Sequence, residues 1–214
     1  MPTSLVSLSV LDFLAKLASS EPAPGGGSAS ALAVAAAAAL VEMVARLTVD
    51  REQFAAVKAD MDAVLSAAPD LHRRAVAFVD KDTEAFEAVM RALRLPKATP
   101  EEKTERRRAV ETATKGAAEV PLRVAAIAAD VLSLARIVAE KGNPSAVTDA
   151  GVAGRLALAG AEGAALNVRI NLGGIQDMEF CGRVTEELDG TLERVRRHAA
   201  AVDAAVQRRL GLNS

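Results

Sequence analysis

The chain has 214 residues, half of them hydrophobic, and a formal net charge of −2. This length and apolar content suit one domain with a sizeable core over residues 1–214, and a slightly acidic chain argues against nucleic acid as a main partner, which would need a basic surface. The single cysteine, Cys181, excludes an internal disulfide and favours a reducing, cytoplasmic compartment.

No targeting or membrane segment is expected. The N-terminus lacks a basic stretch followed by an apolar core, which a secretory signal would need. The longest apolar run, residues 29–47, consists mostly of weakly apolar alanine and is interrupted by Glu42 and Arg46. We therefore expect a soluble protein without a membrane span.

Apolar residues recur at helical spacing along nearly the whole chain, and no segment shows the period of two that is typical of a strand. These patterns predict an all-α fold, a helical bundle. The first predicted element is a short amphipathic helix with leucines at positions 8, 11, 14 and 17, which ends before the prolines at positions 22 and 24.

A glycine loop and an alanine-rich run come next. No charged residue occurs between Ser28 and Val41, so the helix predicted over residues 29–47 should be buried on every side, as the central helix of the bundle. Ser28 is positioned to cap this helix. The three glycines before Ser28 allow either a tight turn or a close approach to an anionic ligand at the positive helix end. They match neither a P-loop nor a dinucleotide-binding loop.

Two amphipathic stretches follow, over residues 53–65 and 71–95, and Pro69 is expected to break the pattern or to begin the second helix. Asp82 lies on the apolar stripe of the second stretch, one turn from a phenylalanine on either side. Desolvation there would raise the pKa of the carboxyl group, which suits a proton donor. The alternative is a core carboxylate that is satisfied by helix N–H groups or by an arginine.

The second half of the chain predicts further helices. Thr99 and Glu102 form a capping box with proline at the first helical position. Pro121 is expected to kink or break the helix, and Gly142 occupies the position of a left-handed cap. The predicted helical segments are residues 100–120, 122–140, 150–172 and 177–210, the third of them capped by Thr148 or Asp149.

Polar residues in apolar surroundings are the other candidates for a ligand site. They are Lys97, Lys141, Asn143, Asp149, Asn167 and Asn171. The alternatives are helix-end capping for Asn143 and Asp149, and hydrogen bonds to a neighbouring helix for the two asparagines spaced four apart. No cluster of histidine, cysteine and carboxylate predicts a metal site, and Cys181 has no base near it in the sequence.

Several short motifs occur in a distinctive order. They are Pro24-Gly25-Gly26-Gly27-Ser28 with its alanine-rich helix, Asp82-Thr83-Glu84-Ala85-Phe86, Leu95-Pro96-Lys97, Val120-Pro121-Leu122, Lys141-Gly142-Asn143, Thr148-Asp149-Ala150-Gly151 and Ala165-Leu166-Asn167-Val168 with Asn171. In this order and spacing, over about residues 8–210, the chain resembles the cyclodeaminase/cyclohydrolase family of folate enzymes. That family includes a cyclodeaminase domain fused to a formiminotransferase in animals, and stand-alone bacterial methenyltetrahydrofolate cyclohydrolases.

The resemblance implies an all-helical homodimer that binds folate in a cleft near the subunit interface, without a metal or another cofactor. Asp82 matches the family's acid, and Gly25, Gly26, Gly27 and Ser28 match its glycine loop. Other candidates are assigned to the substrate: Asn143, Asp149, Asn167 and Asn171 to the pterin or the tetrahedral centre, and Lys97 or Lys141 to the glutamyl tail, for which the glycine loop is an alternative. A formiminotransferase would be a separate partner.

The function implied by this resemblance is acid/base chemistry at the carbon that bridges N5 and N10 of tetrahydrofolate. Asp82 would protonate the departing nitrogen, by a methenyltetrahydrofolate cyclohydrolase or a formimidoyltetrahydrofolate cyclodeaminase reaction. The sequence favours neither reaction over the other. The alternative function is a non-catalytic, folate-binding or scaffold helical dimer.

Overall fold

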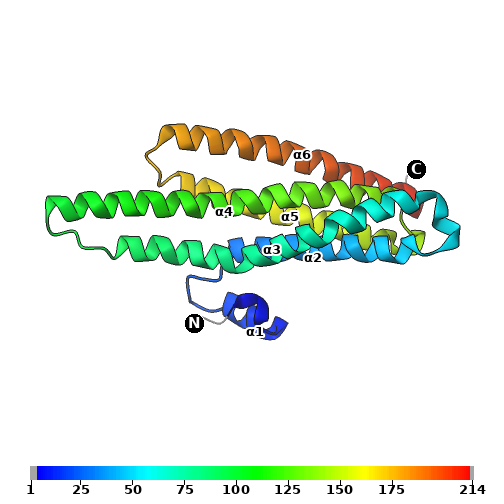
Figure 1. The fold of residues 1–214 in the computed structure, drawn as a ribbon, viewed down its shortest axis with the longest axis horizontal. Coiled ribbons are helices and arrows are strands. Elements are labelled where there is room, and N and C mark those ends of the chain that lie inside the picture. Colours follow the sequence, from blue (N-terminus) through cyan, green and yellow to red (C-terminus); the bar gives the residue numbers. More distant parts are fainter. Residues whose placement is uncertain (1–3, 213–214) are drawn as a thin grey trace.

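Five long helices, α2 to α6, run roughly along one axis and give the molecule an elongated shape (Figure 1). The computed structural model describes residues 4–212, which form helices and turns without a strand, so the all-α prediction is confirmed for these residues. In chain order the elements are η1 (Leu5–Ser7), α1 (Val10–Leu17), α2 (Gly26–Val49), η2 (Glu52–Val57), α3 (Lys58–Leu93), α4 (Pro100–Lys141), η3 (Pro144–Ala146), α5 (Val147–Leu172) and α6 (Met178–Leu210).

Helix α2 packs against α3, α4 and α5, whereas α4 packs against all four other long helices and so takes the central place predicted for α2. Its small side chains let α5 approach closely, and α5 contributes glycines at the same contact: a Cβ atom on Gly160 would lie 2.6 Å from a methyl group of Val34. One stripe of α2 is different, because Leu32 and Leu47 are exposed. The prediction that α2 is buried on every side is therefore wrong for the single chain.

The ends of α2 differ from the prediction at one terminus. The helix begins at Gly26 with Gly25 as its N-cap, so Ser28 lies inside the first turn and does not cap it. It ends at Val49, close to the predicted stop. By length and composition α2 is also the one helix in residues 4–212 that could cross a membrane, a test that buried core helices of this composition pass as well.

Two prolines lie inside continuous helices rather than at breaks. Pro69 lies within α3 and Pro121 within α4, and residues 52–57, predicted as part of a helix over 53–65, form the short η2. A proline removes one helical hydrogen bond, whereas the apolar stripe of α3 continues across Pro69 with Ala68 and Leu71 both buried. Packing of that stripe outweighs the local loss, so the predicted break at Pro69 is wrong.

The helix caps are partly as predicted. Thr99 and Glu102 form the capping box, with Thr99 Oγ1 accepting from Glu102 N at 3.2 Å. Gly142 has φ −69°, so it is not a left-handed cap. Helix α5 starts at Val147 without a side-chain cap, so the prediction of a cap at Thr148 or Asp149 is wrong as well.

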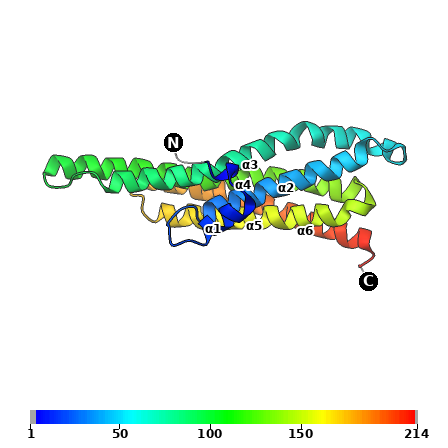
Figure 2. The same ribbon diagram turned by 90° about the horizontal axis from the view of Figure 1, so that it is seen from below.

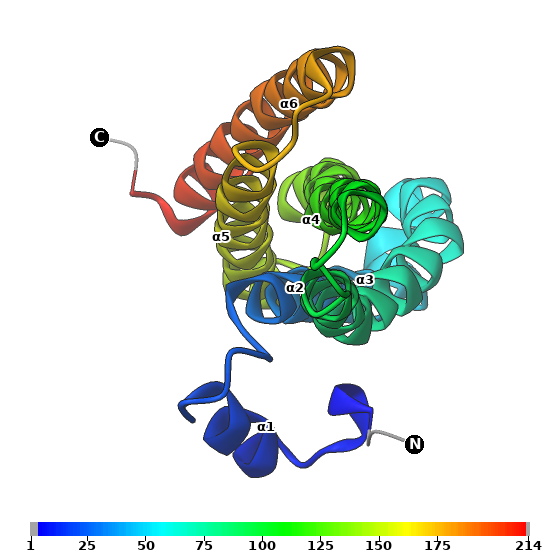
Figure 3. The ribbon, with the colours of Figure 1, turned by 90° about the vertical axis from the view of Figure 1, so that its left-hand side faces the viewer.

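The N-terminal segment lies outside the five long helices (Figure 3), with Leu5 and Phe13 buried against the core. It is anchored where Ser4 Oγ and Leu5 N donate to the Asp80 carboxylate on α3, at 2.5 and 2.6 Å. Beyond this anchor, α1 leaves Val10 and Leu11 exposed. At one end of the molecule, the end of α3 and the start of α4 extend past the other helices as a hairpin (Figure 2).

Candidate active site

Asp82 lines a cleft of about 440 Å³ between the N-terminus of α2, the C-terminal part of α3, the middle of α4 and the C-terminal end of α5. The polar groups in its wall come from the glycine loop, from Asp82 and from two asparagines of α5, and the rest of the wall is apolar. The residues that provide these polar groups are Gly25, Gly26, Gly27, Asp82, Asn167 and Asn171. Residues from distant parts of the sequence thus meet around one carboxylate.

The Asp82 carboxyl group is held from the side of α2 by Ser28. The Ser28 hydroxyl lies 3.3 Å from Asp82 Oδ2 and donates to the Val79 carbonyl oxygen at 2.8 Å. Burial raises the pKa of Asp82, while hydrogen bonds from the Ser28 hydroxyl and backbone N–H oppose that rise. A half-buried carboxyl group with a raised pKa keeps its proton to a higher pH than an exposed one does, which suits acid/base chemistry.

Gly27 provides the space that the Asp82 carboxylate occupies. A Cβ atom on Gly27 would lie 2.6 Å from Asp82 Oδ2 and closer still to Oδ1, whereas a Cβ on Gly26 would have no neighbour closer than 3.8 Å. The group that approaches Gly27 is the protein's own carboxylate, and a ligand site at this loop stays a prediction. Among the three glycines of the loop, Gly27 is the one at which an added methyl group would overlap a neighbouring side chain.

The two asparagines of α5 line the same cleft. Asn167 Nδ2 donates to the Gly163 carbonyl within α5 at 2.9 Å, and Asn171 Nδ2 donates to the Ala117 carbonyl on α4 at 2.9 Å. Ala117 lies four residues before Pro121, which has no N–H, so its carbonyl is free of the usual helical partner. The expected hydrogen bond from this pair to a neighbouring helix is therefore confirmed for Asn171.

Ser28 does not line the cleft. It is 0% exposed, and its hydroxyl is surrounded by Val79, Asp82 and Thr83. The prediction that Ser28 binds the substrate is therefore wrong, because a ligand could not reach its buried side chain. The contact with Asp82 makes it a positioning residue.

Four of the predicted ligand residues lie elsewhere. Asn143 donates to the Leu47 carbonyl and caps η3 through Ser145 N, and Lys141 pairs with Asp60 at 2.7 Å. Together with Asp149 they lie near the C-terminal end of α2, about 30 Å along the helix from the glycine loop. Lys97 is exposed in the loop at the tip of the hairpin. Within one chain, none of these four residues contacts the Asp82 cleft.

The apolar part of the wall was not singled out by the sequence analysis as ligand-binding. It includes Phe86, Met90 and Ile170, together with Pro22 and Ala23 from the segment before the glycine loop. Phe86 was visible one turn from Asp82 on the same stripe. The sequence gives no comparable signal for Pro22 or Ile170, because their position depends on how α1, α3 and α5 are placed in space.

Comparison with known proteins places this geometry in context. A family model described as Formiminotransferase-cyclodeaminase matches residues 9–190. The chain belongs to this family. The formiminotransferase-cyclodeaminase family thus accounts for the great majority of the described residues, and the resemblance drawn from the motifs is confirmed.

Individual family members agree with this membership. A methenyltetrahydrofolate cyclohydrolase from Methylorubrum extorquens is 46% identical over 84% of this chain and 86% of its own length. The formimidoyltransferase-cyclodeaminase of Sus scrofa is 33% identical over 93% of this chain, which spans only 37% of that protein. The crystal structure of a formiminotetrahydrofolate cyclodeaminase from Thermotoga maritima superposes with a TM-score of 0.84, at 30% identity over 94% of this chain and 96% of its own.

Replacing Ser28 by alanine should move the pH dependence of the reaction. The Ser28 hydrogen bonds lower the pKa of Asp82, so their partial loss in Ser28→Ala raises that pKa further, and the limb of the pH–rate profile due to Asp82 should move to higher pH. The measurement is kcat/KM against pH. Ser145→Ala, at the exposed far end of the bundle, is the control and should leave the profile in place. An unmoved limb in Ser28→Ala would show that Ser28 does not tune the titrating group.

Proposed function

We propose that the chain is an enzyme of folate one-carbon metabolism that acts on the N5–N10 bridge of tetrahydrofolate, and that its reaction is the hydrolysis of methenyltetrahydrofolate. Asp82 carries the proposal: it is a carboxyl group with a raised pKa, set in a cleft with two asparagine amides. The 46% identity with a methenyltetrahydrofolate cyclohydrolase over most of both chains supports this choice of reaction.

In the proposed hydrolysis, the Asp82 carboxyl group acts first as a proton acceptor and then as a proton donor. In its ionised form Asp82 accepts a proton from water as the water oxygen bonds to the methenyl carbon. Protonated Asp82 then gives this proton to N5 as the carbon–N5 bond breaks, and the hydroxyl proton of the intermediate leaves to solvent as the formyl group forms on N10. One positioned acid/base group of this kind contributes about 10²–10⁴-fold in rate.

The asparagine amides have capacity left for the substrate. Each uses one N–H in the bonds to Gly163 and Ala117, and a side-chain amide offers a second N–H and a carbonyl oxygen. We assign Asn167 and Asn171 to the pterin edge or to the oxygen of the tetrahedral centre. The proposed steps transfer protons and no electrons, so they need no redox cofactor.

The second candidate reaction is the cyclodeaminase reaction. The structural similarity to the Thermotoga maritima cyclodeaminase favours it, as do the animal relatives. In this reaction N10 attacks the protonated formimino carbon and the N10 proton passes to ionised Asp82; protonated Asp82 then gives this proton to the amine, and ammonia leaves as the methenyl bridge forms. We propose that the formimino substrate would then come from a separate formiminotransferase.

Near-ultraviolet absorbance distinguishes the candidates on one protein preparation. With methenyltetrahydrofolate, a cyclohydrolase removes the chromophore faster than the buffer does. With formiminotetrahydrofolate, a cyclodeaminase creates it and releases ammonia. Binding without turnover of either compound would instead support a folate-binding or scaffold protein and would reject the enzymatic proposal.

We propose that the functional unit is a homodimer formed over α2 and α5. The exposed leucines of α2 lie beside a stripe of α5 on which Leu166 is 66% exposed and Ile170 is 76% exposed. Apolar stripes on two adjacent helices are typical of an interface. Ile170 also lines the Asp82 cleft, so a second copy on this face would lie at the rim of the cleft. The unit is proposed to work in the cytoplasm.

Leu166→Glu should convert the dimer to a monomer. A carboxylate at the centre of an apolar contact would be desolvated without a partner, which weakens association by several kcal/mol. Sedimentation velocity at micromolar concentration measures the outcome. Leu95→Glu, in the loop at the tip of the hairpin, introduces the same charge away from α2 and α5 and should leave the dimer intact. A dimer in both variants would place the interface on another face.

A further inference from the structure

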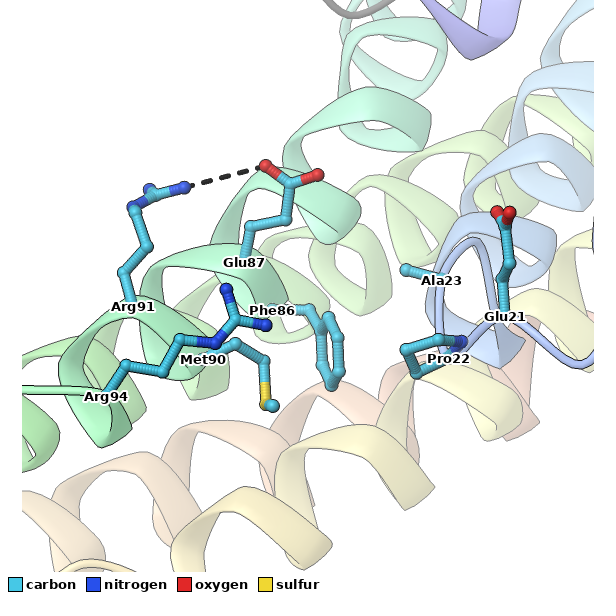
Figure 4. Close-up of a pocket in the computed structure, with 8 residues that line it drawn as sticks. All are labelled: Glu21, Pro22, Ala23, Phe86, Glu87, Met90, Arg91 and Arg94. Carbon is cyan, nitrogen blue, oxygen red and sulfur yellow. Dashed lines mark ion pairs between the residues drawn. The ribbon is translucent and has the colours of Figure 1, made fainter.

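A second cavity, of about 450 Å³, adjoins the Asp82 cleft (Figure 4). The two share four wall residues, Pro22, Ala23, Phe86 and Met90, so they are separated by side chains and not by backbone. The cleft already assigned to the pterin therefore continues along α3 toward the hairpin. Any ligand longer than the pterin has this direction open to it.

The second cavity combines an apolar floor with a cationic end. Phe86 and Met90, both on α3, face Pro22 across it, and Arg94 directs its guanidinium group toward Phe86 (Figure 4). Arg91 pairs with Glu87 at 3.5 Å and points away from the floor. Within residues 4–212, no carboxylate lies within 4.0 Å of the Arg94 guanidinium, so its charge is available to a ligand.

The remaining charge in the wall is Glu21, on the opposite side from Arg94. Its carboxylate points away from the apolar floor (Figure 4). An anion bound at Arg94 therefore meets a guanidinium and the Arg91–Glu87 pair, and Glu21 lies at the rim.

The spacing along α3 fits a rigid ring between two charged ends. Asp82 and Arg94 are twelve residues apart, about 18 Å along the axis, and side chains of a helix lean toward its N-terminus, which brings the guanidinium back by about one turn. Phe86 and Met90 lie between them in angle around the helix as well as along it. By ordinary bond lengths, the folate tail places its first carboxylate about 10 Å from N10, across a benzoyl ring.

We propose that this second cavity binds the aminobenzoyl-glutamate part of the substrate, with the ring against Phe86 and Met90 and a glutamate carboxylate on Arg94. The inference rests on the proposed folate function and adds the residue that recognises the tail. It replaces Lys97 and Lys141 in that role, because Lys97 lies in the loop at the hairpin tip and Lys141 is paired with Asp60 at the other end of α2. A planar guanidinium also suits a carboxylate better than an ammonium does.

The test compares two substrates that differ only in the tail: methenyltetrahydrofolate and the corresponding tetrahydropteroate, which lacks glutamate. In Arg94→Ala, KM for the glutamate-bearing substrate should rise roughly 5- to 10-fold, with kcat within about twofold of wild type, because an exposed charge-assisted contact is lost. KM for the tail-less substrate should not change. Arg73→Ala, an exposed arginine on the same helix paired with Asp70, should change neither value.

Two kinetic results would overturn the inference, and a third result would overturn the proposed function instead. An equal rise in KM for both substrates, or no rise for either, rejects Arg94 as the tail residue while the enzyme still works. If wild type turns over neither substrate, the proposed function fails. The cavity is then probed by ligand-observed NMR with p-aminobenzoyl-glutamate and p-aminobenzoate. Binding of the first that is lost in Arg94→Ala retains the cavity assignment, and equal binding of the two rejects it.

Discussion

Asp82→Asn should keep the fold and lose turnover by about 10²–10⁴-fold, because an amide can neither accept the proton from water nor return it to N5. The loss should fall on kcat, since the asparagine still fills the space opposite Gly27 and the cleft keeps its shape. The measurement is steady-state hydrolysis of methenyltetrahydrofolate. A variant within a few-fold of wild type would show that Asp82 is not the acid/base group.

The same substitution should not weaken the fold at neutral pH. Burial raises the pKa of Asp82 above its value in the unfolded chain. The contribution of Asp82 to the stability of the fold is therefore fully present below the unfolded pKa and is lost as the pH rises through the folded pKa. The asparagine carries no charge, so the Tm of Asp82→Asn should equal or exceed that of wild type above that range, and the difference should shrink at lower pH. Asp70→Asn, on the exposed side of α3, controls for removal of one charge.

Gly27→Ala should lower kcat/KM by about 10²-fold without unfolding the protein. The added methyl group would overlap the Asp82 carboxyl group, which must turn away and leave its contact with Ser28. A displacement of about 1 Å in a catalytic group is enough for a loss of this size. Circular dichroism and kinetics on the same preparation separate loss of the site from loss of the fold.

Two other glycines serve as comparisons for Gly27. Gly190→Ala in α6 adds the same methyl group where nothing lies within 4 Å, and it should leave activity unchanged. Gly26→Ala, where the nearest atom is Asn167 Nδ2 at 3.8 Å, should cause a much smaller loss than Gly27→Ala. Equal losses for Gly26 and Gly27 would mean that the loop acts through its backbone flexibility, and the steric account of Gly27 would be wrong.

Helix positions and the unusual place of Asp82 were predictable from the sequence because both depend on local periodicity. The breaks considered at Pro69 and Pro121 do not occur, for a physical reason. The loss at Pro69 or Pro121 is local, whereas the packing that offsets it involves other helices. Burial on all sides of α2 was also overestimated, since an uncharged alanine helix has the same composition whether its last face meets its own chain or a second copy.

The residues that surround Asp82 in the site were harder to predict than Asp82 itself. Asn143 and Asn171 look alike in the sequence, each a polar residue among small apolar ones. Only the antiparallel arrangement of α2 and its neighbours decides which is near the glycine loop and which lies about 30 Å away. Arg94 was missed because exposed arginines are common, and its value comes from a cavity that two separate segments, residues 21–23 and the end of α3, enclose.

Pro121 leaves a backbone carbonyl in α4 without its usual partner, and a side chain from α5 fills the vacancy. The missing hydrogen bond in α4 thereby provides an acceptor that holds the Asn171 amide of α5 in place in the cleft wall. Any residue with an N–H at this position would compete with Asn171 for the Ala117 oxygen. A regular helix at this point would therefore remove the hydrogen bond that holds Asn171 in the cleft wall, and the proline preserves it.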